Sequence, residues 1–337
     1  MTESLRQVLF VSWDSSQRRP HAPCDSAVLQ ARVEKTFGSE SSGFDHVLAM
    51  LVEQGLLVDQ SGQLSLSDAG AAAAAVVHHE TFREGFEAGL VRLFSSDAHR
   101  QATLAINGTG LRQLNMVDAV QLSHMCDALA LKPGERVVDL GCATGVIAEH
   151  LSDQFGVLAT GVDFARPAIA AAQERTVAKS DRLTFGVQDL NNLALETGSF
   201  DVALSVDTLY FVTDLTTAIS SIRALVQPGG RIGIFWSQNR PSGHSPSSLE
   251  SDNTDLAVAL RASNLTWSCR EFTEEAQTLW ARAVDIYSDL KDVFAAEGNA
   301  DLWEELSGEA TVTQEAYQSG RVRRYFYVVS VPAQAEM

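Results

Sequence analysis

The middle of the chain alternates short apolar runs with segments of helical periodicity. The runs, rich in Val, Ile, Leu and Phe, predict buried strands, and the apolar residues spaced three and four positions apart predict helices. The predicted strands are 136–140, 157–163, 183–187, 200–205 and 231–236, and the predicted helices are 146–155, 167–177 and 215–225. This alternation implies right-handed crossovers, so we predict an α/β fold with a doubly wound parallel sheet covered by helices on both faces.

The amino-terminal part has a different order. Apolar residues at helical spacing predict a helix over 44–53 that ends at Gly55, and two short runs around the turn 59–62 predict a β-hairpin. Ser67-Asp68 then opens a further helix, and this order resembles a winged-helix module. Because the presumed recognition helix contains no Arg or Lys to reach bases or phosphates, we expect a dimerisation or lid domain rather than a DNA-binding one.

The domain boundary is predicted near the paired glycines of Asn107-Gly108-Thr109-Gly110, which interrupt the helical pattern. Residues 1–108 would form the winged-helix-like domain and residues 109–337 the sheet domain, starting with a helix over 116–129. The last strand is predicted at 322–331. If 265–272 is the strand before it, residues 273–320 form a helical insertion at the sheet edge, which is typical of lids and binding elements.

Composition and charge narrow the classes of partner. The chain has 337 residues and a formal net charge of -18, which repels nucleic acids and anionic membranes. No run of about twenty apolar residues is long enough to span a bilayer, and the first residues lack the features of an export signal, so we expect a cytoplasmic protein. The four cysteines stand far apart without a C-x-x-C pair, and the histidines lack metal-ligand spacing, which argues against a metal site and a disulfide framework.

The segment 137–145, Val-Val-Asp-Leu-Gly-Cys-Ala-Thr-Gly, is a strand that runs into a glycine-bearing turn before a helix. Small residues in such a turn let backbone N–H groups approach a ligand closely. Asp139 at the strand end would repel a pyrophosphate but attract an ammonium group. The spacing also departs from the dinucleotide motif G-x-G-x-x-G, because Ala143 occupies the second glycine position. The turn therefore favours a cationic nucleoside over a dinucleotide.

Acidic residues also follow the next strands. Asp163 ends the second strand and can accept bonds from ribose hydroxyls, while Asp189 after the third strand can accept from an exocyclic amine, with Leu190 against a purine face. The segment 207–211 after the fourth strand lies at the mouth of the predicted cleft. Each acid alone suits a helix cap, but their occurrence at successive strand ends indicates one binding site.

The run from Val137 to Trp236 resembles the S-adenosylmethionine-binding core of class I methyltransferases, and Pro228-Gly229-Gly230 is similar to another signature of that family. The resemblance implies that the glycine loop holds the methionine part of the cofactor, Asp163 the ribose and Asp189 the adenine amine, with Phe164 and Leu190 enclosing the base. The implied cofactor-binding residues are Asp139, Gly141, Cys142, Ala143, Gly145, Asp163, Phe164, Asp189, Leu190 and Ser205. Ala143 stands where many members have glycine.

The reaction implied is an in-line displacement on the sulfonium methyl, with S-adenosylhomocysteine as product and a small molecule, such as a specialised metabolite, as acceptor. Tyr210, Asp207 and His244 are the candidate bases or orienting groups, and Tyr210, Phe211 and Trp236 the candidate substrate contacts. The winged-helix region is similar to that of plant-type O-methyltransferases, which dimerise through it and use a histidine after the fourth strand. This chain has no histidine between His150 and His244, so that catalytic arrangement does not carry over.

Three alternatives remain open. The fold can serve a non-methylating isomerisation or cyclisation, because fold alone does not fix chemistry. A cofactor-sensing regulator could use the winged-helix module. A nicotinamide dehydrogenase is the last alternative, and the carboxylate in the first turn disfavours it.

Overall fold

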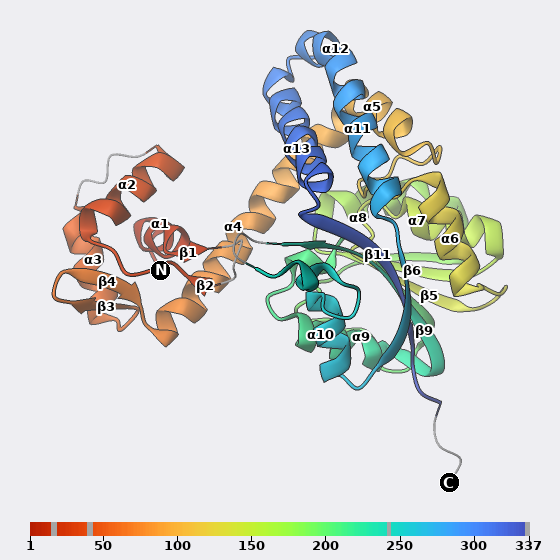
Figure 1. Ribbon diagram of the computed structural model, residues 1–337, viewed down its shortest axis with the longest axis horizontal. Helices are drawn as coiled ribbons and strands as arrows, with labels where there is room; N and C mark the ends of the chain where they lie inside the picture. Colours follow the sequence, from red (N-terminus) through yellow and green to blue (C-terminus); the bar gives the residue numbers. More distant parts are fainter. Residues whose placement is uncertain (15–18, 39–42, 241–243, 334–337) are drawn as a thin grey trace. The chain divides into compact units, whose positions relative to one another are not determined.

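The computed structural model describes residues 1–14, 19–38, 43–240 and 244–333, and its chain divides into two compact units, 1–88 and 89–337 (Figure 1). The division falls inside helix α4 (Asp68–Ser95), whereas the sequence-based boundary lies near residue 108. The following helix α5 (Asp97–Asn107) belongs to the second unit, because its buried face packs against helices from the carboxyl-terminal part of the chain.

The first unit has the predicted order of helices followed by a hairpin. It contains α1 (Glu3–Val11), β1 (Trp13–Asp14), β2 (Arg19–Pro20), α2 (Ser26–Phe37), α3 (Phe44–Glu53), β3 (Leu57–Gln60) and β4 (Gln63–Leu66). The hairpin turns at Ser61 and Gly62, which both have positive φ angles, 56° and 84°. Two left-handed residues make the tight turn that suits the twist of paired strands. The unit has its own core, which includes Leu9, Leu51 and Leu57.

A seven-stranded sheet forms the centre of the second unit, in the order β10-β11-β9-β8-β5-β6-β7. Its strands are β5 (Arg136–Leu140), β6 (Leu158–Asp163), β7 (Leu183–Val187), β8 (Phe200–Val206), β9 (Val226–Asn239), β10 (Thr266–Glu271) and β11 (Val322–Ser330). The central strands β5 and β8 are buried along almost their whole length. Continuous apolar runs, rather than alternating ones, are what a strand covered on both faces requires.

Helices cover both faces of this sheet, which confirms the predicted doubly wound α/β fold (Figure 1). One face packs against α9 (Leu215–Leu225) and α10 (Asp255–Ala262). The other face packs against α6 (Ala119–Leu129), α7 (Val146–Phe155) and α8 (Arg166–Arg175). Short 3₁₀ turns lie at Val177–Lys179, Leu209–Phe211 and Pro246–Leu249.

The sheet adds one antiparallel strand to the parallel strands predicted from the middle of the chain. Strand β11 pairs antiparallel with both β9 and β10, so the sheet is mixed. The insertion between β10 and β11 begins and ends at the same end of these two strands: the amide of Phe272 donates to the carbonyl of Arg324 at 2.7 Å. Strand β11 therefore starts beside the end of β10 and runs in the opposite direction. Its start lies at the carboxyl ends of the parallel strands.

The insertion consists of α11 (Thr273–Asp289), α12 (Lys291–Ala296) and α13 (Ala300–Gln318). Together with α5 these helices form a cap with its own small core, which includes Ala102, Leu279 and Phe294 (Figure 1). Each of these three side chains is at most 1% exposed. In the described ranges, no helix combines the length and hydropathy needed to cross a membrane.

Candidate functional site

The site lies at the carboxyl ends of β5, β6, β7 and β8, where the strand order reverses. Strand β5 pairs with β6 on one side and β8 on the other, so the chain crosses to opposite sides of β5. Loops that diverge at such a point leave room for a ligand between them. Asp139 and Ser205 are the next-to-last residues of β5 and β8, Asp163 is the last residue of β6, and Asp189 follows β7. The predicted strand-end residues therefore meet at one edge of the sheet.

The glycine loop after β5 adopts a conformation that depends on left-handed residues. Gly141, Ala143 and Gly145 have φ angles of 76°, 47° and 70°, and the amides of Gly141 and Cys142 both donate to the carbonyl of Val162, at 2.7 and 3.0 Å. A Cβ at Gly141 would come within 2.4 Å of the Thr208 methyl, so only glycine fits there. Ala143 also adopts the left-handed conformation, which is sterically less favourable for a residue with a Cβ than for glycine.

Asp163 connects the second strand to this loop. Its carboxylate accepts the amide of Ala143 at 2.9 Å and the amide of Ala165 at 2.8 Å. The side chain lies at the buried end of β6. These two bonds fix the orientation of the carboxylate at the strand end where the sequence predicts the ribose.

Asp139 is a buried carboxylate, 3% exposed, whose Oδ2 has no hydrogen-bond partner among the described residues. Burial, and secondarily the negative charge of Asp163, raises the pKa of Asp139 to about 7. An unpartnered buried oxygen is expensive to leave unsatisfied, so a site with this feature fits a ligand that brings a donor or a positive charge. The ammonium-bearing cofactor predicted from the sequence meets that requirement.

The remaining cofactor candidates have these positions. Asp189 accepts both the backbone amide and the side-chain amide of Asn191 at 2.9 Å, which orders the turn after β7. Phe164, which follows Asp163, and Leu190, which follows Asp189, are both half-buried. Ser205 is fully buried, and its hydroxyl lies 2.7 Å from that of Thr208. Burial and the nearby Asp139 raise the pKa of the Cys142 thiol, so it stays protonated.

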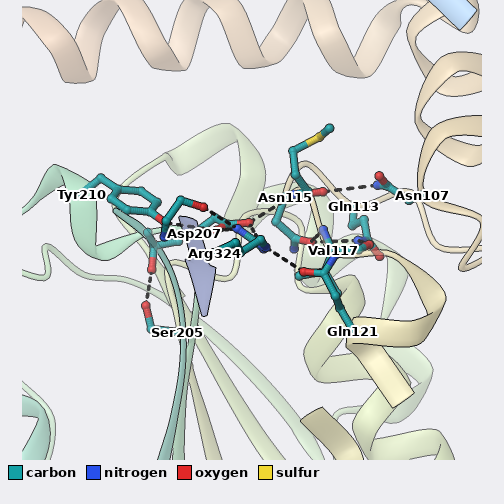
Figure 2. Close-up of polar contacts among 12 residues, drawn as sticks. Asn107, Gln113, Asn115, Val117, Gln121, Ser205, Asp207, Tyr210 and Arg324 are labelled. Atoms are coloured by element: carbon teal, nitrogen blue, oxygen red, sulfur yellow. Dashed lines mark hydrogen bonds and ion pairs between the residues drawn. The ribbon is translucent and has the colours of Figure 1, made fainter. Parts of the chain in front are cut away.

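Asp207, one of the candidate bases, forms a buried ion pair that the sequence did not reveal (Figure 2). Its two carboxylate oxygens accept hydrogen bonds from the two terminal nitrogens of Arg324, at 2.7 and 2.9 Å. Burial alone would lower the pKa of Arg324. The charge and the hydrogen bonds of Asp207 have the larger effect, so the pKa of Arg324 is raised. The signal that could have revealed the pair is an arginine within an otherwise apolar final strand, since a buried cation needs a partner.

Tyr210 is also committed to local contacts. Its hydroxyl accepts the amide of Ser237 at 2.5 Å and donates to Asp207 at 3.4 Å. Burial and the charge of Asp207 raise the pKa of Tyr210, so the phenol keeps its proton. The third candidate base, His244, is exposed next to the segment 241–243. The structure thus brings Asp207 and Tyr210 together as a structural unit.

The candidate substrate contacts differ in exposure. Phe211 is 42% exposed, whereas Trp236 is 5% exposed and donates its indole N–H to Gln238 at 3.0 Å. The ring of Tyr210 lies between them, with its centroid 4.7 Å from that of Trp236. The buried ring of Trp236 therefore packs against the ring of Tyr210. Across the part of the chain that the structure describes, no three His, Cys, Asp or Glu side chains are grouped to hold a metal ion.

Comparisons with known proteins agree with this architecture. Residues 137–230 match the family model described as a methyltransferase domain. A ubiquinone biosynthesis O-methyltransferase of Coxiella burnetii is 28% identical over 130 residues, which cover 39% of this chain and 54% of that protein. The chain thus spans about half the length of this relative.

Two solved structures share the fold. Phosphoethanolamine N-methyltransferase 2 of Haemonchus contortus, in complex with S-adenosylmethionine, aligns with a TM-score of 0.61 at 17% identity over 86% of this chain and 74% of that chain. The [4+2]-cyclase SpnF aligns with a TM-score of 0.54 at 18% identity over 63% of this chain and 80% of that chain. Residues 137–230 are therefore a methyltransferase domain, and the sheet domain around them has the fold of the S-adenosylmethionine-dependent methyltransferases to which it is similar.

Proposed function

We propose that the protein transfers the methyl group of S-adenosylmethionine to a small-molecule acceptor, a specialised metabolite, and releases S-adenosylhomocysteine. The observation that carries the proposal is the buried Oδ2 of Asp139 without a partner, at the end of the strand that enters the glycine loop. A cationic, ammonium-bearing ligand satisfies this oxygen, and a pyrophosphate does not.

Each loop has a proposed task in holding the cofactor. Gly141, Cys142, Ala143 and Gly145 receive the methionine part beside Asp139, and Ser205 supports this region through Thr208. Asp163, whose carboxylate is oriented by the amides of Ala143 and Ala165, binds the ribose. Asp189 accepts from the adenine amine, and Phe164 and Leu190 supply apolar surface on either side of the base.

The bound cofactor supplies an electrophilic methyl group on a sulfonium. The protein's own contribution is to align the acceptor and to exclude water. Asp207 does not serve as a base, because its carboxylate is held by Arg324, and Tyr210 retains its proton. Tyr210 and the exposed Phe211 instead form the acceptor-facing wall after β8, and His244 is the one candidate base with an exposed side chain.

A non-methylating reaction is the second candidate function. The likeness to a cyclase of the same fold supports it, because the cofactor cleft can persist while the chemistry changes. Incubating the protein with S-[methyl-³H]adenosylmethionine and a cell extract separates the two. Label in a small-molecule product supports transfer, and retention of all label in the cofactor supports the alternative.

We also propose that the amino-terminal region up to residue 108 acts as a dimerisation or lid domain in the cytoplasm. Helix α3 carries no Arg or Lys, which disfavours duplex DNA as its ligand. The molar mass measured by light scattering after size-exclusion chromatography, over a range of protein concentrations, tests for the dimer. A mass of one chain at all concentrations would leave only the lid role.

Cofactor binding is tested by calorimetry with S-adenosylhomocysteine. Asp163→Ala removes the acceptor of two backbone amides and of the proposed ribose bonds, so we expect the affinity to fall roughly 10- to 100-fold. Asp181→Ala, an exposed position at the opposite end of β7, is the matched control and keeps wild-type affinity. If the wild-type protein shows no binding, or if both variants bind equally well, the proposed function is wrong.

A further inference from the structure

Arg324 is an almost fully buried cation, 2% exposed, at the start of the antiparallel strand β11. All three of its guanidinium nitrogens have protein acceptors. Besides the two bonds to Asp207, Nε donates to the side-chain oxygen of Gln121 at 2.7 Å and Nη1 donates to the hydroxyl of Ser237 at 3.1 Å. The Ser237 hydroxyl in turn lies 3.1 Å from the hydroxyl of Tyr317, at the end of α13. Arg324 thus links α6, β9 and the cap.

Asp207 extends the same network toward the site. It has a φ of 56°, a strained value for a residue with a side chain, directly after β8. Its Oδ2 accepts the backbone amide of Met116 at 3.2 Å (Figure 2). Met116 lies in the linker between α5 and α6, where the sequence pattern predicts a helix from residue 116 but the chain is irregular until Asp118 caps α6. Asp207 therefore fixes two segments, its own loop and this linker.

The linker is ordered by its own polar side chains. Gln113, 1% exposed, donates to the side chain of Asn115 at 2.8 Å and to the carbonyl of Val117 at 2.6 Å. Asn107 at the end of α5 donates to the carbonyl of Asn115 at 3.3 Å. Met116 is the point at which this ordered linker is bonded to the loop after β8, so its position depends on Asp207.

We propose that Arg324 is a positioning residue that, through Asp207, holds the loop 207–211 and the linker 108–118 in register beside the cofactor site and so forms the acceptor-facing wall. This inference rests on the proposed function. A buried ion pair adds little net stability after desolvation, but it demands one geometry. The bidentate bond fixes the orientation of the Asp207 carboxylate, which the single ammonium group of a lysine does not do.

The test is hydrogen–deuterium exchange of Arg324→Lys and Arg324→Gln, with calorimetric titration of S-adenosylhomocysteine. We expect peptides that contain Met116 and residues 207–211 to exchange at least about tenfold faster in both variants, with the smaller change in Arg324→Lys, while β5 and β6 exchange as in the wild type. The affinity for S-adenosylhomocysteine should stay within about threefold, because the residues proposed to contact it directly lie outside the loop 207–211.

Arg323→Gln is the matched control. Arg323 neighbours Arg324 on the same strand, but its side chain is 43% exposed and interacts with Tyr325 and, at 3.9 Å, with Glu271 instead of Asp207. It should leave every peptide unchanged. The positioning role is overturned if Arg324→Lys keeps wild-type protection at Met116, or if protection is lost evenly across the sheet as for a general loss of stability. Absence of S-adenosylhomocysteine binding by the wild type would instead refute the proposed function, and the exchange result would still decide the positioning role.

Discussion

Asp139 and Asp163 end adjacent parallel strands, and the charge of Asp163 adds to burial in raising the pKa of Asp139 to about 7. Two carboxylates in one buried region disfavour each other's ionisation. Their proximity predicts that the proposed binding of a cationic cofactor at these strand ends depends on pH close to neutrality.

The affinity for S-adenosylmethionine should increase with pH between about 6 and 8. Asp139 is protonated below its pKa of about 7, and a cationic ligand favours the ionised form, so binding releases protons in this range. Calorimetry in buffers of different ionisation enthalpy measures that release. Asp139→Asn should bind more weakly at pH 8 and with a flat pH profile. A wild-type affinity that does not change across this range would contradict the role given to Asp139.

Gly141→Ala should disrupt the cofactor loop. The added Cβ meets Thr208 at 2.4 Å on a backbone with a φ of 76°, so either the loop or Thr208 has to move. We expect a loss of about 1 to 3 kcal/mol in the free energy of unfolding and at least about tenfold weaker binding of S-adenosylhomocysteine. Gly308→Ala in α13 is the control: nothing lies within 4 Å of its Cβ, and it should be neutral or slightly stabilising. Equal behaviour of the two variants would argue against a tight loop.

Tyr210→Phe distinguishes a structural phenol from a catalytic base. Removing the hydroxyl leaves the amide of Ser237 without its acceptor, and we expect the free energy of unfolding to fall by about 1 to 3 kcal/mol. Because the pKa of Tyr210 is raised, methyl transfer by the wild type should show no titration of this phenol from pH 7 to 9. A loss of about 100-fold or more in kcat with unchanged stability would instead identify Tyr210 as the base.

His99 should make the second unit sensitive to acid. Burial, and then the positive charge of Arg112, lowers the pKa of His99 from 6.5 to about 4, so the unfolded chain takes up the proton first. The stability contributed by neutral His99 is complete above pH 6.5 and is lost as the pH falls toward 4. Urea unfolding at pH 7, 5.5 and 4.5 measures this loss. His99→Gln should flatten the dependence, while substitution of the exposed His46 should leave it unchanged.

The order of strands and helices between Arg136 and Trp236 could be predicted from the sequence because each element carries its own periodicity and each turn its own glycine or proline. Two features could not. The direction of β11 depends on where the cap returns to the sheet, which periodicity does not encode. The ion pair between Asp207 and Arg324 joins residues 117 positions apart, and its partners are identifiable only when that direction is known.

The inserted part of the cap, α11 to α13, starts at Thr273 and ends before Val322, between two adjacent antiparallel strands. Both of its attachment points therefore lie side by side, far along the sheet from β6 and β7 at the opposite edge. An insertion whose two ends lie on adjacent strands can be replaced without changing the connections between the other strands. Exchanging this insertion for another one, with β6 and β7 unchanged, therefore tests whether the cap determines the preference for the proposed acceptor.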